Sequence, residues 1–387
     1  MPNPRKNKMP KTAVIVDYVR SPFQFASKGE LARVRPDEMA AQVVRGLLQK
    51  TGITTSDIED LILGCAFPEG EQGSNMARLV GFLADLPLTV AGTTVNRFCG
   101  SSMQAIHMAA GAIAMNAGDV FICAGVESMS RVPMGGYNFM PHPGLAKNFP
   151  QAYMGMGTTA ENLADKYSID RSRQQGLTIT SHQRAADAQA AGRFDDEIIS
   201  ILQGEVSIVR DGCIRPGTSD EALAGLKPAF KSDGSVTAGT SSPLTDGAST
   251  VLVTSEQYAK AHGIPILAKI RSIAVSGCEP DIMGIGPVAS SRKALERAGL
   301  TIADMDIIEL NEAFAVQALA CMDELGVDPA RTNIDGGALA LGHPLGATGA
   351  RITGKAASLL KREGGQFALA SQCIGGGQGI ATILEAM

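Results

Sequence analysis

The sequence predicts an α/β fold built from two related halves, with a long insertion in the first half. Short apolar runs typical of buried strands alternate with helical periods along most of the chain. The segments 52–67 and 299–314 match at one constant offset of 247 residues, the separation of Gly52 and Gly299. Residues 129–242 break this alternation with prolines, glycines and polar loops.

The offset is kept well beyond these two segments. It places Cys99 opposite Gly346 and Val126 opposite Cys373. A register kept over this distance indicates duplication of a domain of about a hundred residues. The alternative is chance similarity between two α/β units. If the halves pack against each other, the duplication would bring the turns around Cys99 and Gly346 face to face.

Each half predicts the same elements in the same order. An apolar strand opens the half, a helix that ends at a glycine follows, and a β-type run comes next. A glycine-framed turn then leads into a helix of small residues, and a last strand closes the half. The strand and outer-helix segments are 13–16, 38–49, 60–63 and 120–123 in the first half, and 268–270, 290–298, 307–310 and 367–370 in the second.

The insertion contains one strong helical stretch, at residues 171–191, and residues 246–253 after it predict a strand that returns to the first half. A helix is expected at 256–262. The chain therefore divides into three predicted regions. They are a first core domain of residues 1–128 plus 243–264, an inserted loop domain of residues 129–242, and a second core domain of residues 265–387.

Composition excludes several classes of protein. The 387 residues are 44% hydrophobic and 19% charged, a globular balance, and the net charge of −5 argues against a nucleic-acid binder. No apolar stretch is long enough to span a membrane, and the basic segment 1–8 lacks the apolar run of a signal peptide. Seven scattered cysteines without a CxxC pair predict reduced thiols in a cytoplasm and no zinc ribbon.

Cys99 is the first candidate catalytic residue. It follows a predicted strand and precedes Gly-Ser-Ser, a polar start for a helix that buries Met103 and Ile106. A thiol at a helix N-terminus faces the positive end of the helix dipole, so the sequence predicts a favoured thiolate with free backbone N–H groups nearby. The alternative is an inert buried cysteine.

His343 and Cys373 lie in the corresponding part of the second half. His343 stands in Gly-His-Pro-Leu-Gly, in the turn that the offset equates with the Cys99 turn, and Asn96 is its counterpart. Cys373 ends a strand before three glycines, whose bare N–H groups can form an oxyanion hole. A tight glycine turn is the plainer interpretation of that loop, and phosphate binding is disfavoured because the lysine of a P-loop is missing.

Other polar residues could have either a functional or a structural role. Asn311 and Glu312 follow a strand and could hold water or a histidine, or form an Asn turn with a solvated Glu. Residues 284–289 match GxGxxA, but Pro287 removes an N–H that a dinucleotide would need. Two histidines and five cysteines are predicted to be structural: His107, His182, Cys65, Cys123, Cys213, Cys278 and Cys321.

Four motifs together resemble the thiolase family over nearly the whole chain. They are Asn-Arg-Phe-Cys-Gly-Ser at 96–101, Asn-Glu-Ala-Phe at 311–314, Gly-His-Pro-Leu-Gly at 342–346 and Cys-Ile-Gly at 373–375. The resemblance implies a duplicated thiolase-type core in five αβαβα layers, with the inserted loop domain binding coenzyme A. It also implies that no metal or redox cofactor is needed, because coenzyme A is a substrate.

The resemblance assigns roles to the motif residues. Cys99 would take the acyl group, His343 would activate it, and Cys373 would shuttle a proton at the α-carbon. Asn311 would hold a water that, with His343, stabilises the enolate oxygen, and the N–H groups of Cys99 and Gly375 would stabilise the oxygen of the acyl-cysteine. Four further residues would contact coenzyme A or the acyl group: Arg215, Ser242, Met156 and Met283.

Within the family, segments 142–145, 237–242 and 281–284 look more like degradative 3-ketoacyl-CoA thiolases, whereas 156–162 is shared with biosynthetic acetoacetyl-CoA thiolases. The expected reaction is thiolysis of 3-ketoacyl-CoA in fatty acid β-oxidation, with the biosynthetic enzyme as the alternative. Gly155 stands where biosynthetic members tend to carry histidine, which favours longer acyl chains.

Two rivals from other classes are disfavoured. A decarboxylating ketoacyl synthase would carry histidine or asparagine in place of Cys373, and a non-catalytic acyl-CoA carrier would need neither cysteine nor the histidine. The family further implies 3-ketoacyl-CoA, acetyl-CoA and coenzyme A as small-molecule partners, a homodimer or homotetramer, and a possible β-oxidation multienzyme partner. No nucleic acid and no membrane span are expected, and the location is expected to be cytoplasmic.

Overall fold

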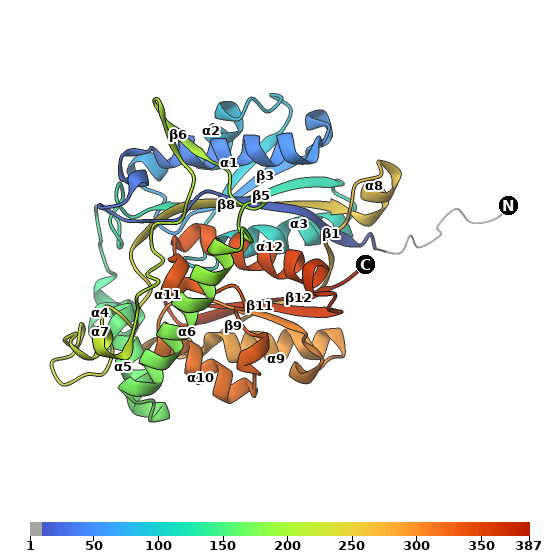
Figure 1. Ribbon diagram of the computed structural model, residues 1–387. Coiled ribbons are helices and arrows are strands. Elements are labelled where there is room, and N and C mark those ends of the chain that lie inside the picture. Colours follow the sequence, from blue (N-terminus) through green and yellow to red (C-terminus); the bar gives the residue numbers. More distant parts are fainter. Residues whose placement is uncertain (1–9) are drawn as a thin grey trace.

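The computed structural model describes residues 10–387, so the basic segment 1–8 lies outside the described residues. Five layers stack in the order helix, sheet, helix, sheet, helix (Figure 1). The helices of the upper, middle and lower layers are α1 (Pro36–Thr51) and α2 (Met76–Leu83), then α3 (Ser101–Ala114) and α12 (Leu345–Glu363), then α9 (Gly286–Ala298) and α10 (Ala315–Leu325). The predicted α/β class and five-layer arrangement are confirmed.

One continuous sheet passes through both β layers. Its strand order is β4 (Ala91–Val95), β3 (Asp60–Gly64), β5 (Val120–Ser128), β8 (Thr245–Ser255), β1 (Ala13–Arg20), β9 (Ala268–Gly277), β12 (Gln378–Glu385), β11 (Phe367–Ile374) and β10 (Ile307–Leu310). A short strand, β2 (Gln24–Phe25), pairs with β8. The halves join where β1 pairs with β9, at Val14–Lys269 and Ile15–Ala268.

The two halves of the sheet repeat the same pairing. Strands β3 and β5 are parallel and β5 and β8 antiparallel, just as β10 and β11 are parallel and β11 and β12 antiparallel. The order β3-β5-β8-β1 in the first half thus equals β10-β11-β12-β9 in the second. This repeated topology agrees with the offset of 247 residues read from the sequence.

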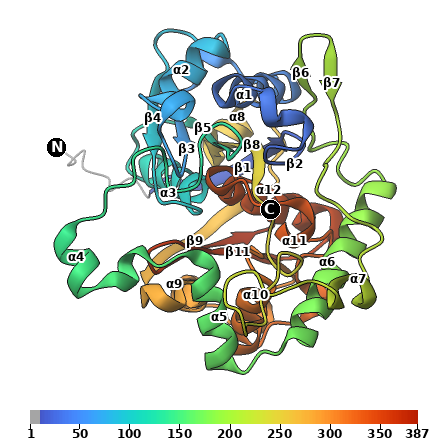
Figure 2. The ribbon, with the colours of Figure 1, turned by 90° about the vertical axis from the view of Figure 1, so that its left-hand side faces the viewer.

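The insertion leaves the sheet after β5 and re-enters it at β8, which is the neighbouring strand. Its elements run along one face of the molecule, with the β6–β7 hairpin near α1 and α5 beside α10 (Figure 2). They are α4 (Pro143–Asn148), α5 (Met156–Tyr167), α6 (Arg171–Ala190), β6 (Ile201–Gln203), β7 (Val206–Ile208) and α7 (Asp220–Ala224). Two short helices lie outside the insertion. Helix α8 (Glu256–Ala261) follows β8, and α11 (Ala338–Leu341) precedes α12.

Buried ion pairs fasten the insertion to both halves. Arg20 on β1 donates to Glu197 at 2.8 Å and to Asp211 at 2.7 Å. Lys355 on α12 donates to the same Glu197 at 2.9 Å and to Asp335 at 2.8 Å. A buried charge needs a bonded partner, so these pairs define how the insertion docks.

The middle layer depends on close contact between backbones. A Cβ on Gly349 of α12 would lie 2.3 Å from the N of Met103 on α3. The Ala350 N–H also donates to Ser102 Oγ at 2.8 Å. The starts of α3 and α12 therefore meet, as the duplication predicted. Within residues 10–387, no helix has the length and apolar character needed to cross a bilayer.

Candidate active site

A tight turn between β4 and α3 presents Cys99. Phe98, just before it, has a φ of +43°, a left-handed conformation that costs energy for a residue with a side chain. The turn is closed by the Gly100 N–H donating to Arg97 O at 2.9 Å, and Asn96 Oδ1 accepts from the Phe98 N–H at 2.8 Å. These bonds hold the nucleophile at the start of the helix, where the sequence placed it.

The predicted resting thiolate at Cys99 is wrong. Burial raises the pKa of the Cys99 thiol to about 12, and the backbone N–H of Gly375 acts in the opposite direction without reversing it. Loss of hydration destabilises a buried thiolate by more free energy than the partial positive charge of one helix end stabilises it. The free protein therefore holds a neutral thiol in contact with an oxyanion-hole donor.

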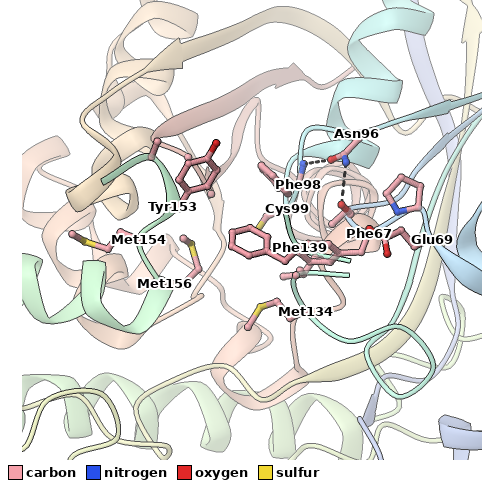
Figure 3. A pocket seen from close by; sticks show the side chains of 18 of the residues that line it. Phe67, Glu69, Asn96, Phe98, Cys99, Met134, Phe139, Tyr153, Met154 and Met156 are labelled. Carbon is pink, nitrogen blue, oxygen red and sulfur yellow. Dashed lines mark hydrogen bonds between the residues drawn. The ribbon is translucent and has the colours of Figure 1, made fainter. Parts of the chain in front are cut away.

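Cys99 opens onto a cavity of about 650 Å³. Figure 3 shows its sulfur beside Phe98 and Phe139, with methionine and tyrosine side chains around the rest of the space. The apolar lining includes Phe67, Phe98, Met134, Phe139, Met140, Tyr153, Met154 and Met156, and Gly375 and Gly376 also face it. Such a lining suits an aliphatic chain better than a charged group.

The turn before α12 holds His343 in a defined tautomer. Gly342 has a φ of +99°, which glycine adopts without strain, and His343 N–H donates to Thr245 Oγ1 at 3.0 Å. Thr348 Oγ1 donates its proton to Pro344 O at 3.0 Å, so it accepts from His343 Nδ1 at 2.6 Å. The lone pair is then on Nε2. Burial lowers the pKa of His343 to about 3, so the imidazole is neutral.

Asn311 joins His343 directly. Its Nδ2 lies 3.4 Å from His343 Nε2, and its buried Oδ1 has no partner among the described residues. An orphaned acceptor in a polar corner is a place for a water. Glu312 beside it is not the solvated side chain that one interpretation allowed. It is buried and accepts from Ser181 Oγ at 2.7 Å and Asn333 Nδ2 at 2.7 Å.

Cys373 ends β11 among apolar side chains. Burial raises the pKa of its thiol, and the nearby Cys99 sulfur raises it further. The following loop turns through Gly376 and Gly377, with φ of +78° and +82°, and this leaves the N–H of Gly375 free to face the cavity. Cys99 and Gly375 thus line the cavity, and the buried Cys373 thiol lies close enough to Cys99 to interact with it.

Both halves of the chain match known family models. Residues 13–257 match the model described as the thiolase N-terminal domain, and residues 264–386 match the one described as the thiolase C-terminal domain. The chain belongs to the thiolase family. The predicted resemblance is therefore confirmed over nearly the whole sequence.

Similar thiolases come from distant organisms. A 3-ketoacyl-CoA thiolase of Bacillus subtilis (strain 168) is 46% identical and one of Shewanella sp. (strain MR-7) is 48% identical, each alignment covering 97% of this chain and 99% of the relative. The crystal structure of human mitochondrial 3-ketoacyl-CoA thiolase has a TM-score of 0.90 at 37% identity, covering 97% of this chain and 99% of that one. The Bacillus anthracis acetyl-CoA acetyltransferase has a TM-score of 0.91 at 38% identity, with 98% and 100% covered.

The residues predicted to contact coenzyme A in this thiolase are less concentrated than the catalytic ones. Met156 lines the cavity with its sulfur against Gly375, and Met283 is buried in the same cluster as Cys373. Arg215 is exposed on the insertion, with its guanidinium 5.0 Å from the ring centre of Phe25. Ser242 is half-buried and donates its N–H to Ala313 O.

Residues predicted to be structural are so placed. His107 is buried against Thr382 Oγ1 at 2.8 Å, and His182 accepts the Arg215 N–H at 3.1 Å. In the GxGxxA segment, a Cβ on Gly286 would lie 2.2 Å from Gln378 O, so this glycine serves helix–strand packing. All seven cysteines are free thiols, and only Cys278 is partly exposed.

Sequence reasoning missed several residues of the thiolase site. Phe139 and Tyr153, which build the cavity, belong to a stretch read only as polar loop; the run of aromatics and methionines at 134–156 was the available signal. Glu127, whose contacts are described below, gave no local signal because it follows an apolar strand. Gln372, which donates its amide to Cys99 O, is equally silent in sequence.

Proposed function

We propose that this thiolase is an acetyl-CoA C-acyltransferase, which cleaves 3-ketoacyl-CoA with coenzyme A to give acetyl-CoA and a shortened acyl-CoA. The observation that carries the proposal is the meeting of the Cys99 thiol and the Gly375 N–H in the wall of one apolar cavity, with the buried Cys373 thiol near enough to interact with Cys99. The relatives from Bacillus subtilis and Shewanella sp. carry the name 3-ketoacyl-CoA thiolase, which supports the same substrate class and a place in β-oxidation.

The first half-reaction forms an acyl-cysteine. Cys99 Sγ attacks the C3 carbonyl carbon while its proton passes to His343 Nε2, the nitrogen that carries the lone pair. The N–H groups of Cys99 and Gly375 stabilise the negative oxygen. Because the free thiol is neutral, charge appears only as the bond to the carbonyl forms. Preorganised donors of this kind contribute several kcal/mol.

Breaking the C2–C3 bond then leaves the acetyl-CoA enolate. Cys373 gives its proton to C2, and the enolate oxygen is held by His343 and by a water on Asn311, whose Oδ1 is free to bind one. Incoming coenzyme A gives its thiol proton to Cys373. The sulfur of coenzyme A then takes the acyl group from Cys99, and the proton on His343 returns to the Cys99 sulfur. No metal or redox cofactor enters this proton balance, and coenzyme A is a substrate.

The insertion is proposed as the coenzyme A domain, bounded by residues 129 and 242, with Arg215 and Ser242 as contacts. Arg215 is an exposed cation of this domain, with its guanidinium over the Phe25 ring, and an exposed guanidinium supports a phosphate or nucleotide-edge contact. A human mitochondrial 3-ketoacyl-CoA thiolase has been solved in complex with CoA, at 37% identity to this chain. The first and second core domains, 1–128 plus 243–264 and 265–387, supply the chemistry.

We also propose a homodimer or homotetramer, formed through the β4 edge. Strand β4 ends the sheet, and α2, which packs on it, exposes Leu79 and Phe82 beside Leu88. An open strand edge flanked by exposed apolar side chains favours pairing with a second copy. A β-oxidation multienzyme partner stays a prediction. The seven free thiols support a cytoplasmic location.

The alternative is a biosynthetic acetoacetyl-CoA thiolase, an acetyl-CoA C-acetyltransferase, which the likeness to the Bacillus anthracis acetyl-CoA acetyltransferase favours. The decisive experiment measures kcat/KM for thiolysis of 3-ketoacyl-CoA substrates of four to sixteen carbons. The apolar cavity predicts values that rise beyond acetoacetyl-CoA, since each buried CH₂ adds up to about 0.8 kcal/mol. Activity confined to acetoacetyl-CoA would assign the biosynthetic function instead.

A further inference from the structure

Glu127 is a buried carboxylate at the boundary between the two halves, and the reaction described above does not use it. It lies near the end of β5 and is 1% exposed. Its Oε2 accepts from the Ala66 N–H at 2.8 Å and from the Gly346 N–H at 2.9 Å. Its Oε1 accepts from the Phe67 N–H at 3.2 Å and from Gln72 Nε2 at 2.8 Å.

These contacts indicate an ionised group. Both carboxylate oxygens accept hydrogen bonds from N–H donors, four in all. A proton on either oxygen would remove one of these acceptor positions and point toward an N–H group, which is unfavourable. Burial raises the pKa of Glu127, whereas the bonds from Ala66, Gly346 and Gln72 lower it. Gly346 stands in the first turn of α12, so the positive end of that helix also favours the anion.

The carboxylate links the acyl cavity to the His343 turn. Ala66 and Phe67 line the cavity, and Gly346 comes three residues after His343. Phe67 packs against Phe98 with ring centres 6.1 Å apart. One side chain thus joins the cavity wall, the aromatic ring beside the nucleophile and the segment that carries the base.

The same carboxylate reaches Cys99 electrostatically. Its negative charge raises the pKa of the Cys99 thiol, in the same direction as burial. Cys373 on β11 is also near Cys99, because the Cys99 sulfur raises the pKa of the Cys373 thiol. The guanidinium of Arg97, on the same turn as Cys99, donates to Gln104 Oε1 at 2.9 Å and to Gln378 Oε1 at 2.8 Å.

We infer that Glu127 is a positioning residue for thiolysis: its carboxylate accepts from the Ala66 and Gly346 N–H groups together and so fixes the His343 turn against the cavity wall beside Cys99. The inference rests on the proposed roles of Cys99 and His343.

Two variants separate geometry from charge. Glu127→Gln keeps the size but removes the charge and puts an NH₂ group against N–H donors. Glu127→Asp keeps the charge but is one methylene shorter, so its carboxylate falls short of the Ala66 and Gly346 N–H groups, which both donate to Oε2. Glu312→Gln is the matched control, because Glu312 is an equally buried carboxylate with three donors in the second half.

The readout is the rate of alkylation by iodoacetamide from pH 6 to pH 11 on the full-length protein, with the modified peptide identified by mass spectrometry. Glu127→Gln should lower the pH at which Cys99 reacts by about one unit, so alkylation at fixed pH quickens about tenfold. Its kcat for thiolysis should nonetheless fall at least tenfold, with the KM for coenzyme A unchanged. Glu127→Asp should lose kcat alone, and Glu312→Gln should leave the alkylation profile in place.

An alkylation profile unchanged in Glu127→Gln would overturn the charge effect, and a wild-type kcat in Glu127→Asp would overturn the positioning role. If Glu127→Gln does not fold, the kcat of Glu127→Asp still decides the positioning role. The alkylation profile of Glu127→Asp should then match that of the unmodified protein, because this variant keeps the negative charge. An acetyl group found on a cysteine other than Cys99, after incubation of the unmodified protein with acetyl-CoA, would instead refute the proposed nucleophile, which distinguishes the two failures.

Discussion

The Cys99 turn and the His343 turn occupy corresponding places in the two halves, yet they differ in what surrounds them. The Cys99 turn carries a left-handed Phe98 and opens onto the acyl cavity. The His343 turn uses a glycine for its positive φ and is buried among hydrogen-bond partners. The comparison teaches that one of two duplicated turns presents a thiol to the cavity, as the proposed nucleophile requires, while the other holds its imidazole in one orientation, as the proposed base requires.

The strands behind the two turns differ in the same way. Gly125 on β5 lets the backbone of Gly346 approach, because a Cβ there would lie 2.2 Å from Gly346 O. The offset equates Gly125 with Gln372 on β11 and Gly346 with Cys99. At that equivalent contact, Gln372 reaches Cys99 O with its amide. A backbone contact on one side thus corresponds to a side-chain hydrogen bond on the other.

The largest effect is expected when the proposed nucleophile on the Cys99 turn is removed. Cys99→Ser should lower kcat for thiolysis by about 10³-fold or more, because an alcohol is a far weaker nucleophile next to a neutral histidine. Intact mass after incubation with acetyl-CoA should show one acetyl adduct on the unmodified protein and none on the variant. An adduct of equal size on the variant would refute the assignment.

Cys373→Ala should separate the two chemical steps. Acylation of Cys99 needs the nucleophile and His343, so the acetyl adduct should persist. Exchange of the acetyl α-hydrogens with solvent should fall by about 10²- to 10⁴-fold, because the proton shuttle is gone. Deuterium incorporation into acetyl-CoA measures this step, and a normal exchange rate would remove Cys373 from the mechanism.

Gly125→Ala tests the backbone contact between the halves. The added methyl group meets a carbonyl oxygen that cannot move aside, so the variant should lose about 1–3 kcal/mol of unfolding free energy in urea. Gly111→Ala on α3 is the control, since no atom lies within 4 Å of its Cβ. That substitution should gain about 0.5–1 kcal/mol. Equal effects at both positions would refute the steric argument.

Gly155→His tests the acyl cavity on the Cys99 side. Gly155 lines the cavity with only Thr158 Oγ1 near its Cβ position, at 4.0 Å, so a large side chain can project into the space. Displacing two methylenes of a long substrate would lower kcat/KM about tenfold for chains of eight carbons or more. Acetoacetyl-CoA should be cleaved nearly as before. An equal loss at all chain lengths would show that the glycine only serves the turn.

Arg215→Ala is expected to have the smallest effect. The guanidinium is exposed, so its interaction with a phosphate is screened by solvent and salt. The KM for coenzyme A should rise about two- to fivefold at low ionic strength with kcat unchanged, as expected for loss of uniform binding. The difference should shrink in 0.5 M salt, and an unchanged KM at low salt would count against the contact.

Much of the fold was predictable because its signals are local or periodic. The strand expected at 307–310 is β10 itself, and the helix expected at 171–191 is α6 within one residue. The turns of Cys99 and His343 were located because glycine and proline fix their backbone. The protonation state of Cys99 was not predictable, since its burial comes from segments far apart in sequence. Glu127 was missed for the same reason: three of its four donors lie sixty or more residues away.

The backbone contacts between α3, α12 and their strands have a consequence for how this enzyme can change. Gly64, Gly125, Gly346 and Gly349 each face main-chain atoms at distances that no side chain tolerates. These close backbone contacts, together with the hydrogen bonds of Glu127 and Ser102, hold the two turns against each other. The loop at 134–153 lines the cavity and takes no part in these four contacts, so libraries that aim at new substrate preferences are best directed there.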